Sequence, residues 1–154
     1  MQFHSTAVFV SDIERSKDFY TGFLNMEVEH DFGKNVILHN GITLWEIQEA
    51  HTIARELATQ EPTNRFELYF ESDEIEESFE VLKNAGIPFL HEIHEEPWGQ
   101  RTMRFFDPDG HLIEVGEPLE VFVRNMYKKG LSPEEIKQKS GIPIETINDL
   151  LSGF

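Results

Sequence analysis

The order of hydrophobic and polar positions predicts a strand, a helix and three more strands at the start of the chain. Residues 3–10 are rich in β-branched and aromatic side chains, and Asp12 then favours the start of a helix over 13–24. Three short strands are expected next, at 26–30, 36–39 and 42–48. Asn40 and Gly41, between the last two strands, form a pair typical of tight β-hairpins.

The same order of elements begins again at Arg65. A strand is expected at 66–70, followed by a helix at 73–84 that ends at Gly86. Three further strands are predicted, at 88–93, 100–106 and 111–116. Residues 107–110 join the last two strands and carry Pro and Gly at the positions that turn geometry favours. The second part of the chain is therefore predicted to repeat the first.

Two related modules are expected within one α+β fold. A shift of 62 residues carries three residues onto identical ones: Ile13, Glu14 and Ser16 onto Ile75, Glu76 and Ser78. Neither four-stranded sheet buries both of its faces alone, so the two βαβββ modules are expected side by side around an open cup. The predicted domain covers residues 1–117, with module 1 at 1–50, a linker at 51–64 and module 2 at 65–117.

Residues 118–154 lie outside this repeat and are predicted to form a helical extension. Three helices are expected: one at 119–129, one that opens at the capping box Ser132-Pro133-Glu134-Glu135, and one at 143–151. An apolar stripe along the extension is made of Leu131, Ile136, Ile142, Ile144, Ile147, Leu150 and Leu151. Such a stripe is expected to pack on the domain or on a partner subunit, which predicts a homodimer or a lid.

Composition narrows the classes of partner. Acidic residues outnumber basic ones 29 to 13, and the formal net charge of −16 would repel a nucleic-acid backbone. No apolar run approaches the roughly 20 residues needed to cross a bilayer, and the first residues lack a secretion signal, so a cytoplasmic protein is expected. The absence of cysteine excludes disulfides and thiolate metal sites. Nucleotide-binding glycine motifs are missing from the sequence, so no nucleotide cofactor is expected.

Two segments carry recognisable motifs. Residues 12–26 read DIERSKDFYTGFLNM, and residues 104–117 read RFFDPDGHLIEVGE. They resemble the first helix and the closing hairpin of the vicinal oxygen chelate superfamily, which includes glyoxalases, bleomycin-resistance proteins and ring-cleaving dioxygenases. Residues 97–101, PWGQR, are similar to a bacterial glyoxalase-like branch. The resemblance covers residues 3–117 and implies a small-molecule ligand and, for an enzyme, a lyase, isomerase or dioxygenase.

The resemblance also implies where a metal ion would bind. Metal-dependent members of the superfamily hold one divalent ion with four side chains, one on the first strand and one on the last strand of each module. By position, these places fall on Ser5, Glu46, Glu67 and Glu114. Members usually have His or Gln at the first-strand positions, whereas this chain has Ser5 and Glu67 there. A zinc or nickel site rich in imidazole is therefore not expected at these positions.

Strand alternation predicts that three of these side chains, Glu46, Glu67 and Glu114, face the cup. Three carboxylates in a partly buried space cannot all ionise without a positive partner. A Mg or Mn ion is one candidate, since all-oxygen ligand sets favour hard cations. It would polarise a substrate and stabilise an enolate, while Glu67 or Glu114 serves as catalytic ligand and base.

Arginine is the other candidate for the positive partner. Arg101 and Arg104 lie on the strand expected at 100–106 and could form bidentate pairs with Glu46 or Glu114, which would make a metal unnecessary. The cup would then be a metal-free pocket for a flat or cationic compound. Its predicted substrate-binding residues are Ser5, Tyr69, Trp98, Arg101 and Arg104. His91 and His94 are expected to point to opposite faces of their strand, and so to form no metal site.

Overall fold

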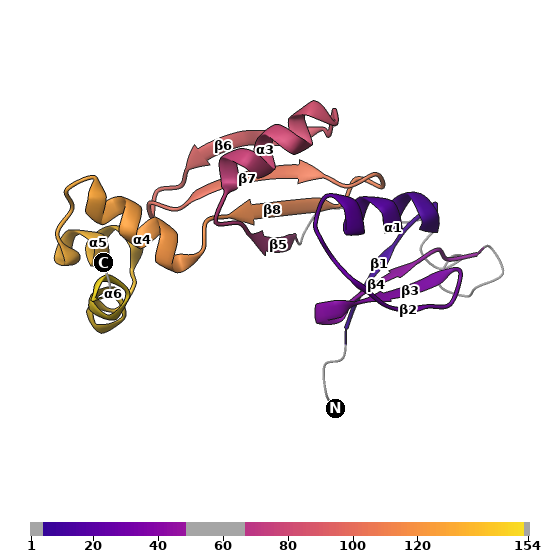
Figure 1. Ribbon diagram of the computed structural model, residues 1–154, viewed down its shortest axis with the longest axis horizontal. Coiled ribbons are helices and arrows are strands. Elements are labelled where there is room, and N and C mark those ends of the chain that lie inside the picture. Colours follow the sequence, from indigo (N-terminus) through magenta and orange to yellow (C-terminus); the bar gives the residue numbers. More distant parts are fainter. Residues whose placement is uncertain (1–4, 49–66, 153–154) are drawn as a thin grey trace, which may run out of the picture. The chain divides into compact units, whose positions relative to one another are not determined.

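The computed structural model describes residues 5–48 and 67–152 (Figure 1). The chain divides into two compact units. The first contains residues up to 65 together with the turn Asp107–His111, and the second contains Phe66–Phe106 and Leu112–Phe154. The predicted linker at 51–64 lies outside the described residues. Within the described part of the chain, every helix is too short or too polar to span a lipid bilayer.

In its described residues, the first unit is a four-stranded mixed sheet with one α-helix. Its elements are β1 (Thr6–Phe9), α1 (Ile13–Gly22), β2 (Val28–Asp31), β3 (Asn35–Leu38) and β4 (Ile42–Trp45). The strand order is β1-β4-β3-β2, with β1 parallel to β4 and the other pairs antiparallel. The predicted hairpin between β3 and β4 contains a short 3-10 turn, in which Asn40 takes a φ of 70°.

The second unit repeats this arrangement and confirms the predicted α+β fold. Its elements are β5 (Leu68–Glu71), α3 (Ile75–Asn84), β6 (Phe89–Glu95), β7 (Arg101–Phe106) and β8 (Leu112–Gly116). The strand order is β5-β8-β7-β6, with β5 parallel to β8. The starts of β1 and β5 are 62 residues apart, Thr6 and Leu68, as are the starts of α1 and α3, Ile13 and Ile75. The offset of 62 residues that the sequence repeat predicted therefore holds for the first strand and the helix of each unit.

Helix α1 shows how the sequence forms these elements. Asp12 caps its first turn, because the carboxylate accepts a hydrogen bond of 3.0 Å from the N–H of Arg15. Ile13, Phe19 and Tyr20 recur at helical spacing and are buried against the sheet. The apolar partners of this face include Val8, Val36, Leu38 and Leu44, each almost fully buried.

The second sheet has one apolar face and one polar face. Met103, Phe105 and Ile113 are fully buried on the face that packs on α3. Phe79 of α3 reaches this face through a ring contact with Phe89 at 5.3 Å between centroids. The alternate positions of the same strands carry polar side chains instead: Glu67, Tyr69, Thr102, Arg104 and Glu114.

The helical extension folds around its own core. Its helices are α4 (Leu119–Lys128), α5 (Pro133–Ser140) and α6 (Ile144–Leu151), and the predicted capping box at Ser132 is confirmed. Most of the predicted stripe packs against α4: Leu131, Ile136, Ile142, Ile147, Leu150 and Leu151 contact the cluster of Phe122, Val123 and Met126. The expectation that the stripe packs on the domain was wrong, because α4 supplies an apolar face of its own, while packing on a partner subunit stays a prediction.

The extension contacts the second sheet and its loops at Glu95 and at Gly99, among other places. The carboxylate of Glu95 on β6 binds Lys129 at 2.7 Å and Lys139 at 2.6 Å, which lowers the pKa of Glu95 to about 2. Gly99, in the loop after β6, has a φ of 99°, and a Cβ there would lie 2.4 Å from the sulfur of Met126. Any side chain at this position would therefore strain the backbone and collide with α4.

The turn Asp107–His111 packs into the first unit through a buried carboxylate. Asp107 accepts hydrogen bonds from the hydroxyl of Tyr20 at 3.1 Å and from Nδ1 of His111 at 2.8 Å. Contact with Asp107 raises the pKa of His111, more than burial lowers it. Burial alone would raise the pKa of Asp107, but the hydrogen bonds from His111 outweigh it and the pKa is lowered.

Replacing His111 by alanine is expected to cost more stability at about pH 5.5 than at about pH 8.5. Because the pKa of His111 is raised in the folded protein, the stabilisation from its contact with Asp107 is complete below the unfolded-state pKa of about 6.5. This stabilisation is lost as the pH rises through the folded-state pKa. Urea unfolding should show a loss of about 1–2 kcal/mol at the lower pH. His39→Ala, at an exposed histidine, is the control, and an equal loss for His111→Ala at both pH values would contradict the prediction.

Candidate functional site

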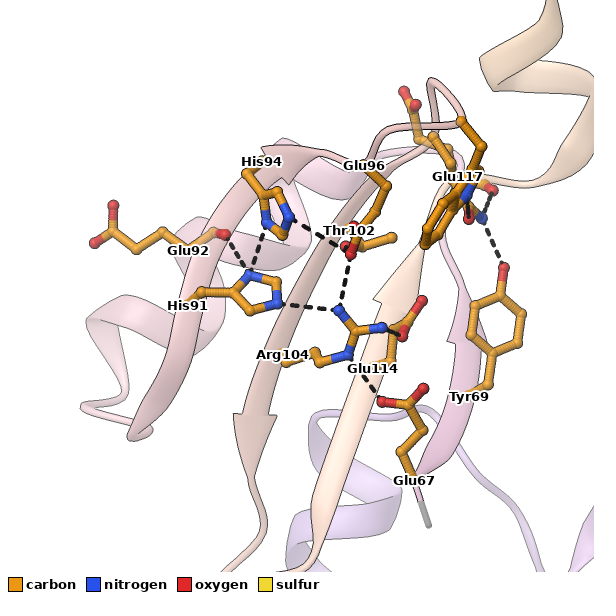
Figure 2. Close-up of polar contacts among 12 residues, drawn as sticks. Glu67, Tyr69, His91, Glu92, His94, Glu96, Thr102, Arg104, Glu114 and Glu117 are labelled. Atoms are coloured by element: carbon orange, nitrogen blue, oxygen red, sulfur yellow. Dashed lines mark hydrogen bonds and ion pairs between the residues drawn. The ribbon is translucent and has the colours of Figure 1, made fainter. Parts of the chain in front are cut away.

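One row of side chains crosses all four strands of the second sheet on its polar face. The strand register pairs Tyr69 with Glu114, Glu114 with Arg104, and Arg104 with His91. Opposed residues in neighbouring strands lie close enough for their side chains to meet. In Figure 2 the surrounding polar groups converge on the guanidinium of Arg104.

The guanidinium of Arg104 contacts three carboxylates at once. Its Nε donates to Glu67 at 2.8 Å, and its Nη1 donates to Glu96 at 2.9 Å. Its Nη2 donates to an oxygen of Glu114, a carboxylate that is only 6% exposed. The hydrogen bond with Glu67 is the largest of the effects that raise the pKa of Arg104. Arg104 is therefore the positive charge that the sequence required beside Glu67 and Glu114.

Glu67 and Glu114 differ in how readily they lose a proton. The hydrogen bond from Arg104 lowers the pKa of Glu67. Burial raises the pKa of Glu114 to about 7, helped by its contact with Glu67 and opposed by the charge of Arg104. Near neutral pH the more exposed carboxyl is thus ionised, while the buried one is partly protonated.

Gln100 fixes two aromatic rings beside this row. Its side-chain oxygen accepts from Nε1 of Trp98 at 3.0 Å, and its Nε2 donates to the hydroxyl of Tyr69 at 2.9 Å and to the carbonyl of Glu117 at 2.8 Å. Tyr69 is 48% exposed and Trp98 is 38% exposed. The site therefore presents two aromatic side chains to solvent, held in place by one amide.

A bulge in β6 brings together a group that the sequence pattern missed. His91 pairs with Arg104 and His94 pairs with Thr102, so three steps along β6 match two along β7. The extra residue cancels the alternation that predicted opposite faces for the two histidines. Their Nδ1 atoms lie 3.0 Å apart, and Nε2 of His94 lies 3.5 Å from Glu96. His91, His94 and Glu96 each place one possible metal-ligand atom within 4.8 Å of the others.

Arg101 lies on the opposite face of β7 from Arg104. Its Nε donates to the buried carboxylate of Glu117 at 2.9 Å, and its Nη1 donates to Glu76 on α3. Glu117 in turn accepts from Asn125 of α4 at 2.9 Å. The structure therefore gives Arg101 a place in the packing of α3 and α4, and does not bring it to the Glu67 and Glu114 pair.

The other two predicted positions, Ser5 and Glu46, belong to the first unit. Ser5 directly precedes β1, as Glu67 directly precedes β5. Glu46 accepts hydrogen bonds from Nζ of Lys34 at 2.5 Å and from the N–H of Ile13 at 2.8 Å. The contact with Lys34 is the largest cause of the lowered pKa of Glu46.

These contacts bear on whether the four implied positions suit a metal ion. Glu46 is paired with Lys34, and Glu67 and Glu114 are paired with Arg104. Ser5, the fourth position, offers neither an imidazole nor a carboxylate. All three carboxylates of this set bind basic side chains and the set contains no imidazole, so a divalent cation would have to displace both Lys34 and Arg104 and would gain no nitrogen ligand. The set does not fit such a cation.

Comparison with known families and structures gave consistent matches. The sequence profile described as a glyoxalase-like domain matches residues 3–120, and so ends at the start of the helical extension. Comparison with curated proteins gave no match. A solved structure of a protein of unknown function from Agrobacterium tumefaciens str. C58 is 33% identical, covers 77% of this chain and 95% of its own, and has a TM-score of 0.64.

Two other solved structures share the fold at lower identity. A glyoxalase/bleomycin resistance protein/dioxygenase from Nocardioides is 24% identical over 78% of this chain and 85% of its own, with a TM-score of 0.58. A lactoylglutathione lyase from Agrobacterium tumefaciens is 23% identical over 75% of this chain and 92% of its own, with a TM-score of 0.57.

Replacing Gly116 by alanine is expected to release the two aromatic rings. A Cβ there would lie 2.8 Å from Nε2 of Gln100 and 3.2 Å from Tyr69, so Gln100 would swing away and lose its hydrogen bonds. Urea unfolding should show a loss of about 1–2 kcal/mol, and the fluorescence of Trp98 should shift. Gly22→Ala, where a Cβ meets nothing within 4 Å, is the control. Unchanged stability and fluorescence in Gly116→Ala would contradict the close approach.

Proposed function

Because the chain belongs to the family of glyoxalase-like domains, we propose that it binds a small organic cation on the polar face of its second sheet, without a metal at Ser5, Glu46, Glu67 and Glu114. The observation that carries this proposal is the pairing of Arg104 with three carboxylates. An internal guanidinium already supplies the charge that a metal would otherwise supply.

Negative charge still exceeds positive charge on this face. Among the described residues it carries the carboxylates of Glu67, Glu71, Glu96 and Glu114, whereas Arg104 is the basic side chain that contacts three of them. One guanidinium cannot balance several carboxylates, and a surface with an excess of one sign of charge attracts ligands of the opposite sign. Glu67, 34% exposed, is the carboxylate of the Arg104 cluster most open to a ligand.

The aromatic side chains favour a planar cation over a compact one. Tyr69 and Trp98 are both substantially exposed, and Gln100 holds both. The face of an aromatic ring attracts a cation through its quadrupole and packs well on a flat apolar body. A delocalised aromatic cation satisfies the carboxylates and the rings together.

The proposed binding is coupled to a proton at Glu114. Since the pKa of Glu114 is about 7, this carboxyl is partly protonated in neutral solution. A cation that binds beside it favours the ionised form and so releases the proton. Affinity is therefore expected to rise as the pH increases through 7, by up to about tenfold per pH unit below the pKa.

The alternative is a Mg- or Mn-dependent lyase, isomerase or dioxygenase, with Glu46, Glu67 and Glu114 as ligands and Glu67 or Glu114 as the base. The pKa of Glu114 suits a general base, since proton transfer is most efficient with a pKa near the operating pH. This alternative needs Arg104 and Lys34 to release their carboxylates, and the metal-free function does not.

Titration with N-methylacridinium, a planar organic cation, tests the proposal through quenching of tryptophan fluorescence. The full-length protein should bind it at neutral pH in the presence of chelator, and anthracene-2-sulfonate, a three-ring planar anion, should bind far more weakly. Glu67→Gln is expected to weaken binding by about tenfold, because it removes a charge while it keeps the shape. Glu114→Gln should abolish the rise in affinity with pH.

Glu80→Gln is the matched control, since it removes one exposed carboxylate from α3. It should leave the affinity for N-methylacridinium unchanged apart from the small effect of net charge. Equal affinity in the native protein and in Glu67→Gln would refute the proposal. Binding that requires added Mg or Mn, and is lost in Glu46→Gln, would establish the metal-dependent alternative instead.

We also propose that the protein forms a homodimer and is cytoplasmic, as the sequence led us to expect. The helical extension gives no support for the homodimer, because most of its apolar stripe packs against α4. Analytical ultracentrifugation of the full-length protein would decide whether the chain forms a dimer.

A further inference from the structure

We propose that His91, His94 and Glu96 bind one divalent transition-metal ion, of the type of zinc, on the polar face of β6 and the loop that follows it. This site lies on different elements from the four positions implied by the resemblance, which fall on the first and last strands of each module. It shares Glu96 with the carboxylates of the proposed organic-cation site, whereas the two histidines belong to the metal site alone.

The donor set suits such an ion. Two imidazoles and one carboxylate, with open positions for water, form a ligand set that zinc uses in proteins. Nε2 of His94 lies 3.5 Å from Oε1 of Glu96, and His91, His94 and Glu96 each have one possible ligand atom within 4.8 Å of the others. Two ligands at about 2.1 Å from one ion, roughly tetrahedral, lie about 3.4 Å apart, so the separation of His94 and Glu96 matches.

Neighbouring groups hold the donors in place. Arg104 can only donate, so Nε2 of His91 accepts the hydrogen bond of 3.2 Å from its Nη1. Neutral His91 therefore carries its proton at Nδ1, which donates to the carbonyl of Glu92 at 2.9 Å. The hydroxyl of Thr102 donates to Glu96 at 3.1 Å. Contacts of this kind, from one ring nitrogen to a carbonyl and from a hydroxyl to the carboxylate, orient metal ligands in proteins.

Arg104 occupies the cation position in the structure. Its Nη1 lies 3.2 Å from Nε2 of His91 and 2.9 Å from Oε1 of Glu96, between a ring nitrogen and a carboxylate that an ion would bind (Figure 2). A metal ion must displace Nη1, while Nε and Nη2 can keep their bonds to Glu67 and Glu114. Removing the guanidinium should therefore strengthen metal binding.

Calorimetric titration of Zn(II) into the untagged, chelator-treated full-length protein tests the site. The native protein should bind one ion per chain, and Co(II) should give the visible absorption of a nitrogen- and oxygen-ligated site. His94→Gln and Glu96→Gln should each weaken binding by about tenfold or more. The side chain of His94 is 46% exposed, so its replacement leaves the fold intact.

Matched controls separate this site from others. His30→Gln changes an exposed histidine of the first unit, and Glu92→Gln removes an exposed carboxylate while it keeps the carbonyl that orients His91. Both should bind Zn(II) as the native protein does. Arg104→Met should bind it several times more tightly, because the competing cation is gone. Glu67→Gln, which tests the organic-cation site, should change the affinity for Zn(II) little.

Three results would overturn the inference. They are the lack of saturable binding by the native protein, undiminished binding by His94→Gln and Glu96→Gln, and weaker binding by Arg104→Met in a sample whose circular dichroism is native. Loss of Zn(II) binding in Glu46→Gln alone would place the ion at the positions implied by the resemblance, and would equally exclude this site.

Discussion

Arg104 and the carboxylates around it set the chemistry of the second unit. Four parts of the chain supply the group, since Glu67 precedes β5, Glu114 lies on β8, Glu96 follows β6 and Arg104 lies on β7. Without the guanidinium, three carboxylates would share a partly buried surface and repel one another. Removing one partner from a buried ion pair commonly costs several kcal/mol for this reason. Both proposed binding functions of the sheet face depend on the group.

Packing elsewhere in the second unit holds this group in place. Helix α3 buries the other face of the sheet, so the strands present alternate residues to the Arg104 side. Gly116 leaves space for Tyr69 and Gln100 to cross β8, and Gly99 lets the loop that carries Trp98 approach α4. The helical extension is thus part of the support of the site, through Met126 beneath Gly99 and the two lysines on Glu95.

Local regularity explains which features the sequence could predict. Turn residues and periodicity predicted the strands and helices of both modules. Alternation along β5 and β8 predicted that Glu67 and Glu114 share a face, because those strands pair without interruption, and Arg104 was one of two arginines expected near Glu114. It could not predict the bulge in β6, which depends on pairing with β7, so His91 and His94 were expected on opposite faces. The close spacing of His91, His94 and Glu96 in the sequence was the signal that could have indicated this group.

The sequence also could not predict which side chains pair with the buried charges. Arg101 and Arg104 are three residues apart on one strand, so alternation places them on opposite faces, but only the observed register shows which of them meets Glu114. The stripe of the extension was visible as a pattern, but its partner was not, because α4 itself provides the covering surface. Patterns predict which side of an element is apolar, whereas tertiary packing determines what covers it.

The charge states around Arg104 can be measured directly by carbon-detected NMR titration of the glutamate carboxyl groups. Glu114 is expected to titrate at about 7, with Glu67 below its usual range, and both should move in Arg104→Met. If both titrate at the ordinary glutamate value of about 4.3, and neither responds to the loss of Arg104, the guanidinium does not organise this face.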